Sequence, residues 1–206
     1  MNEAAKPLSS DPISREPAWE IARLFPNQGH WSEEEYLALD RNQLVEFSHG
    51  HVEVLPMPTT THQRIVAMLY RTLMTFVMNN TLGEALFAPL RVRLWPGKYR
   101  EPDLVFMLAE HRERISDACW DGADLVIEVV SDEFRRHDLE TKRFEYARAG
   151  IPEYWIVDPL EAKITVLRLD EDHYVVHGEF PRGSMATSAL LAGFGVNVSD
   201  VFDAKP

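Results

Sequence analysis

A strand–helix–strand pattern near the middle of the chain limits the fold most strongly. Residues 124–130 contain five strongly apolar side chains, and residues 153–157 form a second apolar run. Between them, residues 138–149 have helical spacing and stop at Gly150, a residue type that commonly ends helices. Two strands joined through one helix lie parallel in the same sheet, because the helix returns the chain to its starting edge. We therefore predict an α/β fold around a buried β-sheet.

The neighbouring segments add strands and helices to this unit. Alternating or continuous apolar residues predict strands at 44–47 and 51–55 (a hairpin), 90–94, 103–107, 164–169 and 174–176. A capping box at Ser32 predicts a short helix, and Thr60 or Thr61 caps a longer one with a broad apolar face. The later strands pair as antiparallel hairpins, so the predicted sheet is mixed.

Composition indicates one globular domain. The chain has 206 residues, enough for one α/β core, and 26% of them are charged. Residues 1–28 are rich in proline and predict a flexible N-terminal arm, which leaves residues 29–206 as a single domain. The single cysteine, Cys119, excludes an intrachain disulfide and fits a reducing compartment, so we expect a cytoplasmic location.

Glu128 is the first candidate for a functional residue. It lies inside the apolar run of residues 124–130, which is expected to be buried on both faces. An ionised carboxylate there is costly unless it is paired or binds a metal. The alternatives are a place at the sheet edge or a pair with an arginine.

Asp103 is the second candidate, at the start of the strand 103–107 and directly after Pro102. Alone, an aspartate beside a proline is typical of a turn. Together with Glu128 on an adjacent strand, it forms a pair of carboxylates that suits a hard cation such as Mg²⁺.

Lys142 lies on the helix 138–149, beside the stripe expected to face the sheet. Two interpretations remain open from its spacing. Its ammonium points toward a polar site near the sheet, or it forms an ordinary i,i+4 pair with Asp138, worth about 0.3–0.5 kcal/mol.

An ordered series of segments resembles a known family. The series includes Glu101-Pro102-Asp103, Glu128-Val129-Val130-Ser131, Asp138-Leu139 with Lys142, and the run from Tyr146 through Glu153-Tyr154-Trp155 to Asp158. Together these segments resemble the Uma family of restriction endonucleases, within the PD-(D/E)XK nuclease superfamily. The likeness runs from about Trp31 to Phe202.

This resemblance implies a restriction-endonuclease-like mixed β-sheet core flanked by helices, and a metal-dependent endonuclease that hydrolyses DNA. It implies Asp103, Glu128 and the backbone carbonyl of Val129 as ligands of Mg²⁺ or Mn²⁺. The superfamily's usual lysine falls here on Val130, so Lys142 is the replacement that would stabilise developing negative charge. A homodimer is expected, because duplex cleavage suits two-fold symmetry.

The charge balance supports a rival interpretation. The formal net charge is −12, whereas nucleic-acid binders usually carry a basic face. With Val130 in place of the lysine, the alternative is a catalytically silent, oligomeric binding or structural module that retains the nuclease fold.

Four further residues are candidates for supporting roles. Glu46 approaches the site from the early hairpin, or is a solvent-facing strand glutamate. His62 contacts the metal-bound water or phosphate, or is an ordinary helix-end residue, at a helix N-terminus that disfavours its cationic form. Arg135 and Arg136 contact backbone phosphate or belong to a solvated surface.

Overall fold

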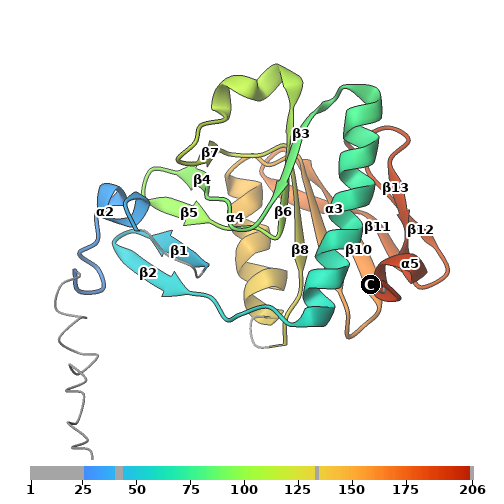
Figure 1. The fold of residues 1–206 in the computed structure, drawn as a ribbon, viewed down its shortest axis with the longest axis horizontal. Helices are drawn as coiled ribbons and strands as arrows, with labels where there is room; N and C mark the ends of the chain where they lie inside the picture. Colours follow the sequence, from blue (N-terminus) through green and yellow to red (C-terminus); the bar gives the residue numbers. More distant parts are fainter. Residues whose placement is uncertain (1–25, 40–43, 133–134, 205–206) are drawn as a thin grey trace, which may run out of the picture.

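The computed structural model describes residues 26–39, 44–132 and 135–204. A six-stranded sheet forms its centre, in the order β11-β10-β9-β8-β6-β3 (Figure 1). The strands are β3 (Gly83–Phe87), β6 (Leu104–Leu108), β8 (Leu125–Val129), β9 (Glu153–Asp158), β10 (Lys163–Asp170) and β11 (His173–Pro181). Strands β8 and β9 are parallel, and the other neighbours are antiparallel. The mixed sheet predicted from the sequence is therefore confirmed.

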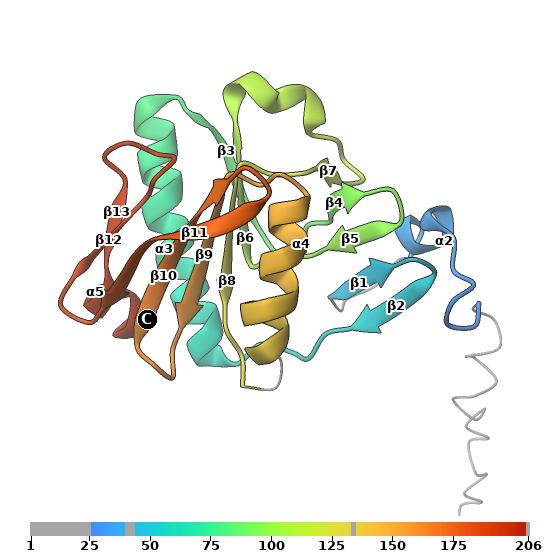
Figure 2. The same ribbon diagram turned by 180° about the vertical axis from the view of Figure 1, so that it is seen from behind.

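Two helices cover opposite faces of this sheet, α3 (Thr60–Asn80) on one side and α4 (Lys142–Arg148) on the other (Figures 1 and 2). The alternation of side chains along β8 explains this arrangement. Ile127 and Val129 pack in the apolar cluster that contains α3, whereas Val126 and Val130 pack in the cluster that contains α4. Glu128 shares the α4 face with Val126 and Val130.

The long helix begins slightly earlier than its sequence predicts. Thr59 is the N-cap, and its hydroxyl accepts a hydrogen bond from the His62 amide at 3.2 Å. The helix continues through Asn80 and ends at Thr81, which adopts a left-handed conformation (φ 54°). This start places His62 in the first turn, at the end of the helix nearest the candidate site.

The early hairpin belongs to a second sheet rather than to the central one. This sheet has the order β2-β1-β5-β4-β7. Its strands are β1 (Val45–Ser48), β2 (His51–Val54), β4 (Val92–Trp95), β5 (Lys98–Arg100) and β7 (Trp120–Asp121). The predicted capping box is confirmed in α2 (Glu33–Leu37), where Ser32 and Glu35 bond to each other's backbone amides.

Several short elements were not predicted. They are β3, β5, β7, a 3₁₀ helix (Ala109–Arg114), β12 (Met185–Thr187), β13 (Gly195–Asn197) and α5 (Val198–Phe202). The C-terminal elements extend the core on the α3 side through Ala186, Val196 and Val198.

The proposed N-terminal arm, residues 1–28, lies almost wholly outside the described residues and stays a prediction. No helix in the described part of the chain is long and apolar enough to cross a membrane.

Candidate active site

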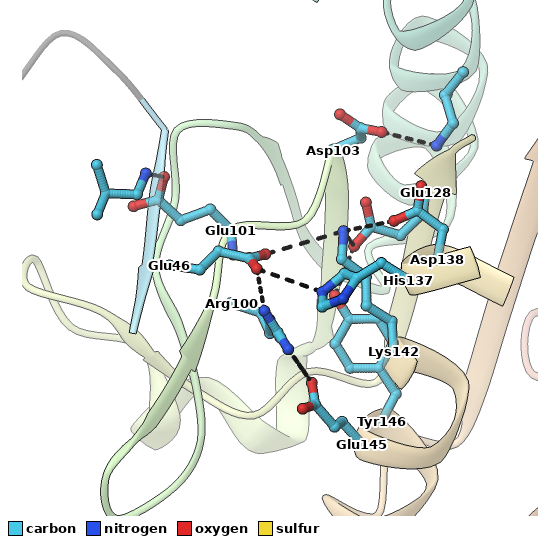
Figure 3. A network of polar contacts seen from close by, with 12 residues as sticks. Glu46, Arg100, Glu101, Asp103, Glu128, His137, Asp138, Lys142, Glu145 and Tyr146 are labelled. Atoms are coloured by element: carbon cyan, nitrogen blue, oxygen red, sulfur yellow. Dashed lines mark hydrogen bonds and ion pairs between the residues drawn. The ribbon is translucent and has the colours of Figure 1, made fainter. Parts of the chain in front are cut away.

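The backbone brings Asp103 and Glu128 to the same end of two neighbouring strands of the central sheet. Leu104 of β6 pairs with Ile127 of β8 in antiparallel register. Asp103 precedes Leu104 and Glu128 follows Ile127, so both residues lie just beyond the same end of this pairing. Asp103 Oδ2 also accepts a hydrogen bond from the Val129 amide at 2.8 Å. Both carboxylates line one cavity of about 470 Å³. The two side chains predicted as metal ligands therefore lie together, and Val129 lines the same cavity (Figure 3).

Glu128 is only 3% exposed, as its apolar surroundings predict. Its Oε1 accepts a hydrogen bond from the Tyr146 hydroxyl at 2.6 Å and lies 2.9 Å from Lys142 Nζ. Burial raises the pKa of Glu128 to about 8 against the opposing charge of Lys142, and the charges of Asp103 and Asp138 add to the rise. Burial therefore disfavours the ionised form of Glu128 more strongly than Lys142 favours it.

Lys142 lies among three carboxylates. Its Nζ is 2.9 Å from Glu128 Oε1, 3.0 Å from Asp138 Oδ1 and 4.0 Å from Glu46 Oε1. Burial lowers the pKa of Lys142, but these carboxylates outweigh it and hold the pKa well above its ordinary value. Both interpretations of the sequence are therefore correct, because the i,i+4 pair with Asp138 and the contact with the sheet carboxylate occur together.

A single turn of π-helix (His137–Thr141) leads into α4. It carries Asp138, which is only 5% exposed although it lies in the first turn of the segment. Single π-turns occur frequently at functional sites. Here the turn brings Asp138 beside Lys142, and the Asp138 carbonyl accepts a bond from Tyr154 at 3.0 Å.

Glu46 lies inside the molecule, so the solvent-facing alternative is wrong. It is 1% exposed and forms an ion pair with Arg100. Burial raises the pKa of Glu46, but Lys142, Arg100 and His137 outweigh burial and hold the pKa below its ordinary value. Arg100 also pairs with Glu145 at 2.7 Å, so one buried network links the second sheet to α4 (Figure 3).

His62 Nε2 lies 3.2 Å from Asp103 Oδ2. From the sequence, the helix N-terminus was expected to disfavour the cationic form of His62, but the pKa of His62 is raised overall. Burial does lower the pKa of His62, but the hydrogen bond and charge of Asp103, the charge of Glu128 and a hydrogen bond to Val129 together raise it. His62 therefore belongs to the site as a charge partner of Asp103.

Arg135 and Arg136 pair with carboxylates outside the cavity. Arg135 lies 2.6 Å from Asp158 Oδ2, and Arg136 lies 2.9 Å from Glu140 Oε2. Arg136 is highly exposed, which agrees with a solvated surface. Contact of either arginine with phosphate stays a prediction.

The donor chemistry fits a divalent cation of the Mg²⁺ type. Within the residues that the structure describes, no three Asp, Glu, His or Cys side chains form a metal-binding group. Mg²⁺ does not require such a group, because it usually binds one or two carboxylates and keeps several waters. Two carboxylates that line one cavity meet this requirement.

From the sequence, Lys142 was identified, but four other residues of the site were missed: Asp138, Tyr146, Arg100 and Glu145. Asp138, Lys142 and Tyr146 recur every four positions, so all three lie on one helix face, and this spacing could have revealed the set. Arg100 and Glu145 gave no such signal, because charged residues in short segments usually face solvent.

Comparison with known proteins agrees with this fold. The Uma2 family, described as “Putative restriction endonuclease”, matches residues 33–199. A crystal structure from Anabaena variabilis, described as a putative nuclease of the DUF820 family, superposes with a TM-score of 0.69 at 17% identity. The match covers 84% of this chain and 98% of that chain, and it shows the nuclease-like fold. No curated protein matches the chain. The family match spans most of the sequence, and the chain belongs to the Uma2 family.

Proposed function

We propose that this protein is a metal-dependent endonuclease that hydrolyses DNA phosphodiester bonds. One observation carries the proposal: Asp103 and Glu128 share a cavity in which Lys142 lies 2.9 Å from Glu128. Two carboxylates and an ammonium in one partly open cavity supply a cation site and a positive charge for a reacting phosphate. Membership of a family described as restriction endonucleases supports DNA as the substrate.

In this proposal the carboxylates of Asp103 and Glu128 would hold Mg²⁺ or Mn²⁺, with the Val129 carbonyl as a third ligand. A bound cation supplies Lewis-acid polarisation of the phosphodiester and a lower pKa for a coordinated water. Tyr146 and the Val129 amide fix the directions of the two carboxylates through their hydrogen bonds. Such partners of metal ligands usually matter for affinity.

Lys142 stabilises the negative charge that develops on the phosphate. Its protonated state is maintained by Glu128, Glu46 and Asp138, which all raise its pKa. Asp138 also restrains the ammonium at 3.0 Å, so its position does not depend on Glu128 alone. Val130 is only 5% exposed and packs in the core, so it takes no part in this chemistry.

Cleavage of supercoiled plasmid in Mg²⁺ or Mn²⁺ tests the proposal. The wild-type protein should cleave, and Asp103→Asn and Glu128→Gln should not, while both variants remain folded by circular dichroism. Asp121→Asn is the control, because Asp121 is an exposed aspartate that pairs with Arg93 away from the cavity. Normal cleavage by both site variants would show that the assignment is wrong. A folded wild type that binds no divalent cation would favour the silent binding module.

The proposed homodimer is tested separately. Light scattering coupled to size-exclusion chromatography should give twice the chain mass of 23.7 kDa. A monomer at the concentrations used for cleavage would contradict it.

A further inference from the structure

The mouth of the candidate active site is apolar, a feature that the proposed hydrolysis does not use. Two separate segments line it: the connection from β2 to α3, with Leu55, Pro56 and Met57, and the turn from β9 to β10, with Pro159 and Leu160. Met57 is 74% exposed and Leu160 is 65% exposed. Exposed apolar residues that cluster beside a functional cavity commonly mark a binding surface.

The cations that line the same cavity are already paired with carboxylates. His62 lies 3.2 Å from Asp103 and Lys142 lies 2.9 Å from Glu128, whereas burial and the charge of Arg100 lower the pKa of His137 and disfavour its charged form. A duplex binder gains affinity by neutralising several phosphates with lysine and arginine side chains. Around this cavity, the described residues offer apolar contact more readily than positive charge.

We propose that the site accepts DNA in which the nucleotide beside the scissile phosphate is unpaired and unstacked, as in a single strand, a flap or a frayed end. Met57 and Leu160 pack against the base of that nucleotide. The inference rests on the proposed function, because that function places the scissile phosphate at Asp103 and Glu128.

Duplex and single-stranded DNA differ in how far the faces of their bases are exposed. In a duplex these faces are covered by neighbouring base pairs, so the apolar mouth would gain nothing from them. An unpaired base exposes both faces, and enzymes that act on extruded bases hold them between aromatic or apolar side chains. Methionine suits such a contact because its thioether is flexible and polarisable.

The size of the cavity agrees with this occupant. Its volume of about 470 Å³ lies within the range of sites that hold one small molecule. One nucleotide is an occupant of that size, whereas a duplex would have to remain outside the mouth.

Binding and cleavage of three labelled substrates test the inference. They are a single-stranded oligonucleotide, the same strand annealed to its full complement, and a duplex with a single-stranded flap. Binding is measured by fluorescence anisotropy in Ca²⁺, a hard cation of the same class, and cleavage is measured in Mn²⁺. Each substrate is tested with wild type and with the double variant Met57→Ser/Leu160→Ser.

The matched control is Met78→Ser/Met185→Ser. Met78 and Met185 are 66% and 52% exposed, and neither lines the cavity. All four substitutions replace exposed side chains, so both double variants should fold. The wild type should bind the single strand and the flap more tightly than the duplex. The Met57/Leu160 variant should lose about tenfold in single-strand affinity, the scale of losing one stacked base. Duplex binding should not change, and the control should behave as wild type.

Equal binding of the duplex and the single strand would overturn the inference, as would an unchanged Met57/Leu160 variant. The two proposals can fail independently. Cleavage of duplex as fast as single strand would reject the inference and leave the nuclease intact. Selective, Met57-dependent binding without cleavage of any substrate would support the apolar contact and reject the nuclease.

Discussion

Lys142 Nζ lies 2.9 Å from Glu128 Oε1, joining helix α4 to the buried strand β8. The position two residues after Glu128, where the superfamily's lysine is expected, is the core residue Val130. The ammonium therefore reaches the carboxylate from the helix instead of from the strand. Asp138 and Glu46 lie 3.0 and 4.0 Å from the same ammonium, so its position is fixed from three sides.

Replacement of Lys142 by methionine should slow DNA cleavage by about 10²–10³-fold, the usual cost of losing one group that stabilises transition-state charge. Lys142→Arg should not restore the rate, because a planar guanidinium does not replace a compact ammonium among three carboxylates. Single-turnover kinetics in Mn²⁺ would measure both. Lys163→Met is the control, since Lys163 pairs with Glu161 and Glu179 on the surface. A Lys142→Met variant that cleaves DNA at the wild-type rate would show that Lys142 takes no part in the mechanism.

Replacement of Tyr146 by phenylalanine should weaken Mn²⁺ binding by about tenfold, because the hydroxyl that orients Glu128 is lost. The ring should still pack against Tyr154, with which it makes an edge-on contact. Tyr174→Phe is the matched control, since it removes another buried hydroxyl, one that donates to the Ile151 carbonyl. Calorimetric titration of Mn²⁺ into both variants distinguishes a specific loss of metal affinity from the general effect of removing a buried hydroxyl. Equal Mn²⁺ affinity in both would show that Tyr146 has only a structural role.

Glu46 should make the stability of the fold depend on acid pH. Its pKa in the folded protein lies below the ordinary value of 4.5, so its ionised form stabilises the fold above that pH. This contribution is lost as the pH falls through the lower folded pKa. Glu46→Gln should reduce the free energy of unfolding at pH 7 by about 1.5–3 kcal/mol, the range for a hydrogen bond to a charged group.

Urea unfolding at a series of pH values would measure this effect. The difference between wild type and Glu46→Gln should shrink as the pH falls below 4.5. Glu34→Gln, at an exposed position of α2, should follow the wild-type curve. A difference that stays constant down to acid unfolding would mean that ionised Glu46 does not stabilise the fold.

Glu153 should be important for stability but not for metal binding. It is fully buried and accepts hydrogen bonds from Trp155, Ser188, Ala189 and Leu190, all between 2.6 and 2.7 Å. Glu153→Gln should destabilise the fold by about 2–4 kcal/mol, because one or two buried donors lose their acceptor. Thermal unfolding measures the loss, and a Mn²⁺ titration should match wild type. A loss of Mn²⁺ binding would contradict a purely structural role.

Glu153 and Glu128 also show what the sequence can and cannot predict about the site. Both are glutamates beside apolar strand residues, and both are buried. Glu153 meets four donors from nearby loop and strand groups, whereas Glu128 meets Tyr146 and Lys142 inside a cavity. Hydrophobic pattern predicts burial of both but not their partners, because most of the partners come from other segments of the chain.

The fold was predictable where hydrophobic periodicity is strong. The parallel pair β8 and β9, the hairpin of β1 and β2, and α3 all follow from apolar spacing. Strand β5 was not predictable, because Lys98 and Arg100 look like surface residues. They are buried because both pair with Glu145 of α4, a contact that local sequence does not encode.

Titration of Mn²⁺ into the folded protein tests the central claim most directly. We predict a divalent-cation site in the wild type that disappears in Asp103→Asn and in Glu128→Gln and persists in Asp121→Asn. A wild type that binds no Mn²⁺, or an Asp103→Asn variant that binds it as tightly as wild type, would contradict a metal site at these two carboxylates.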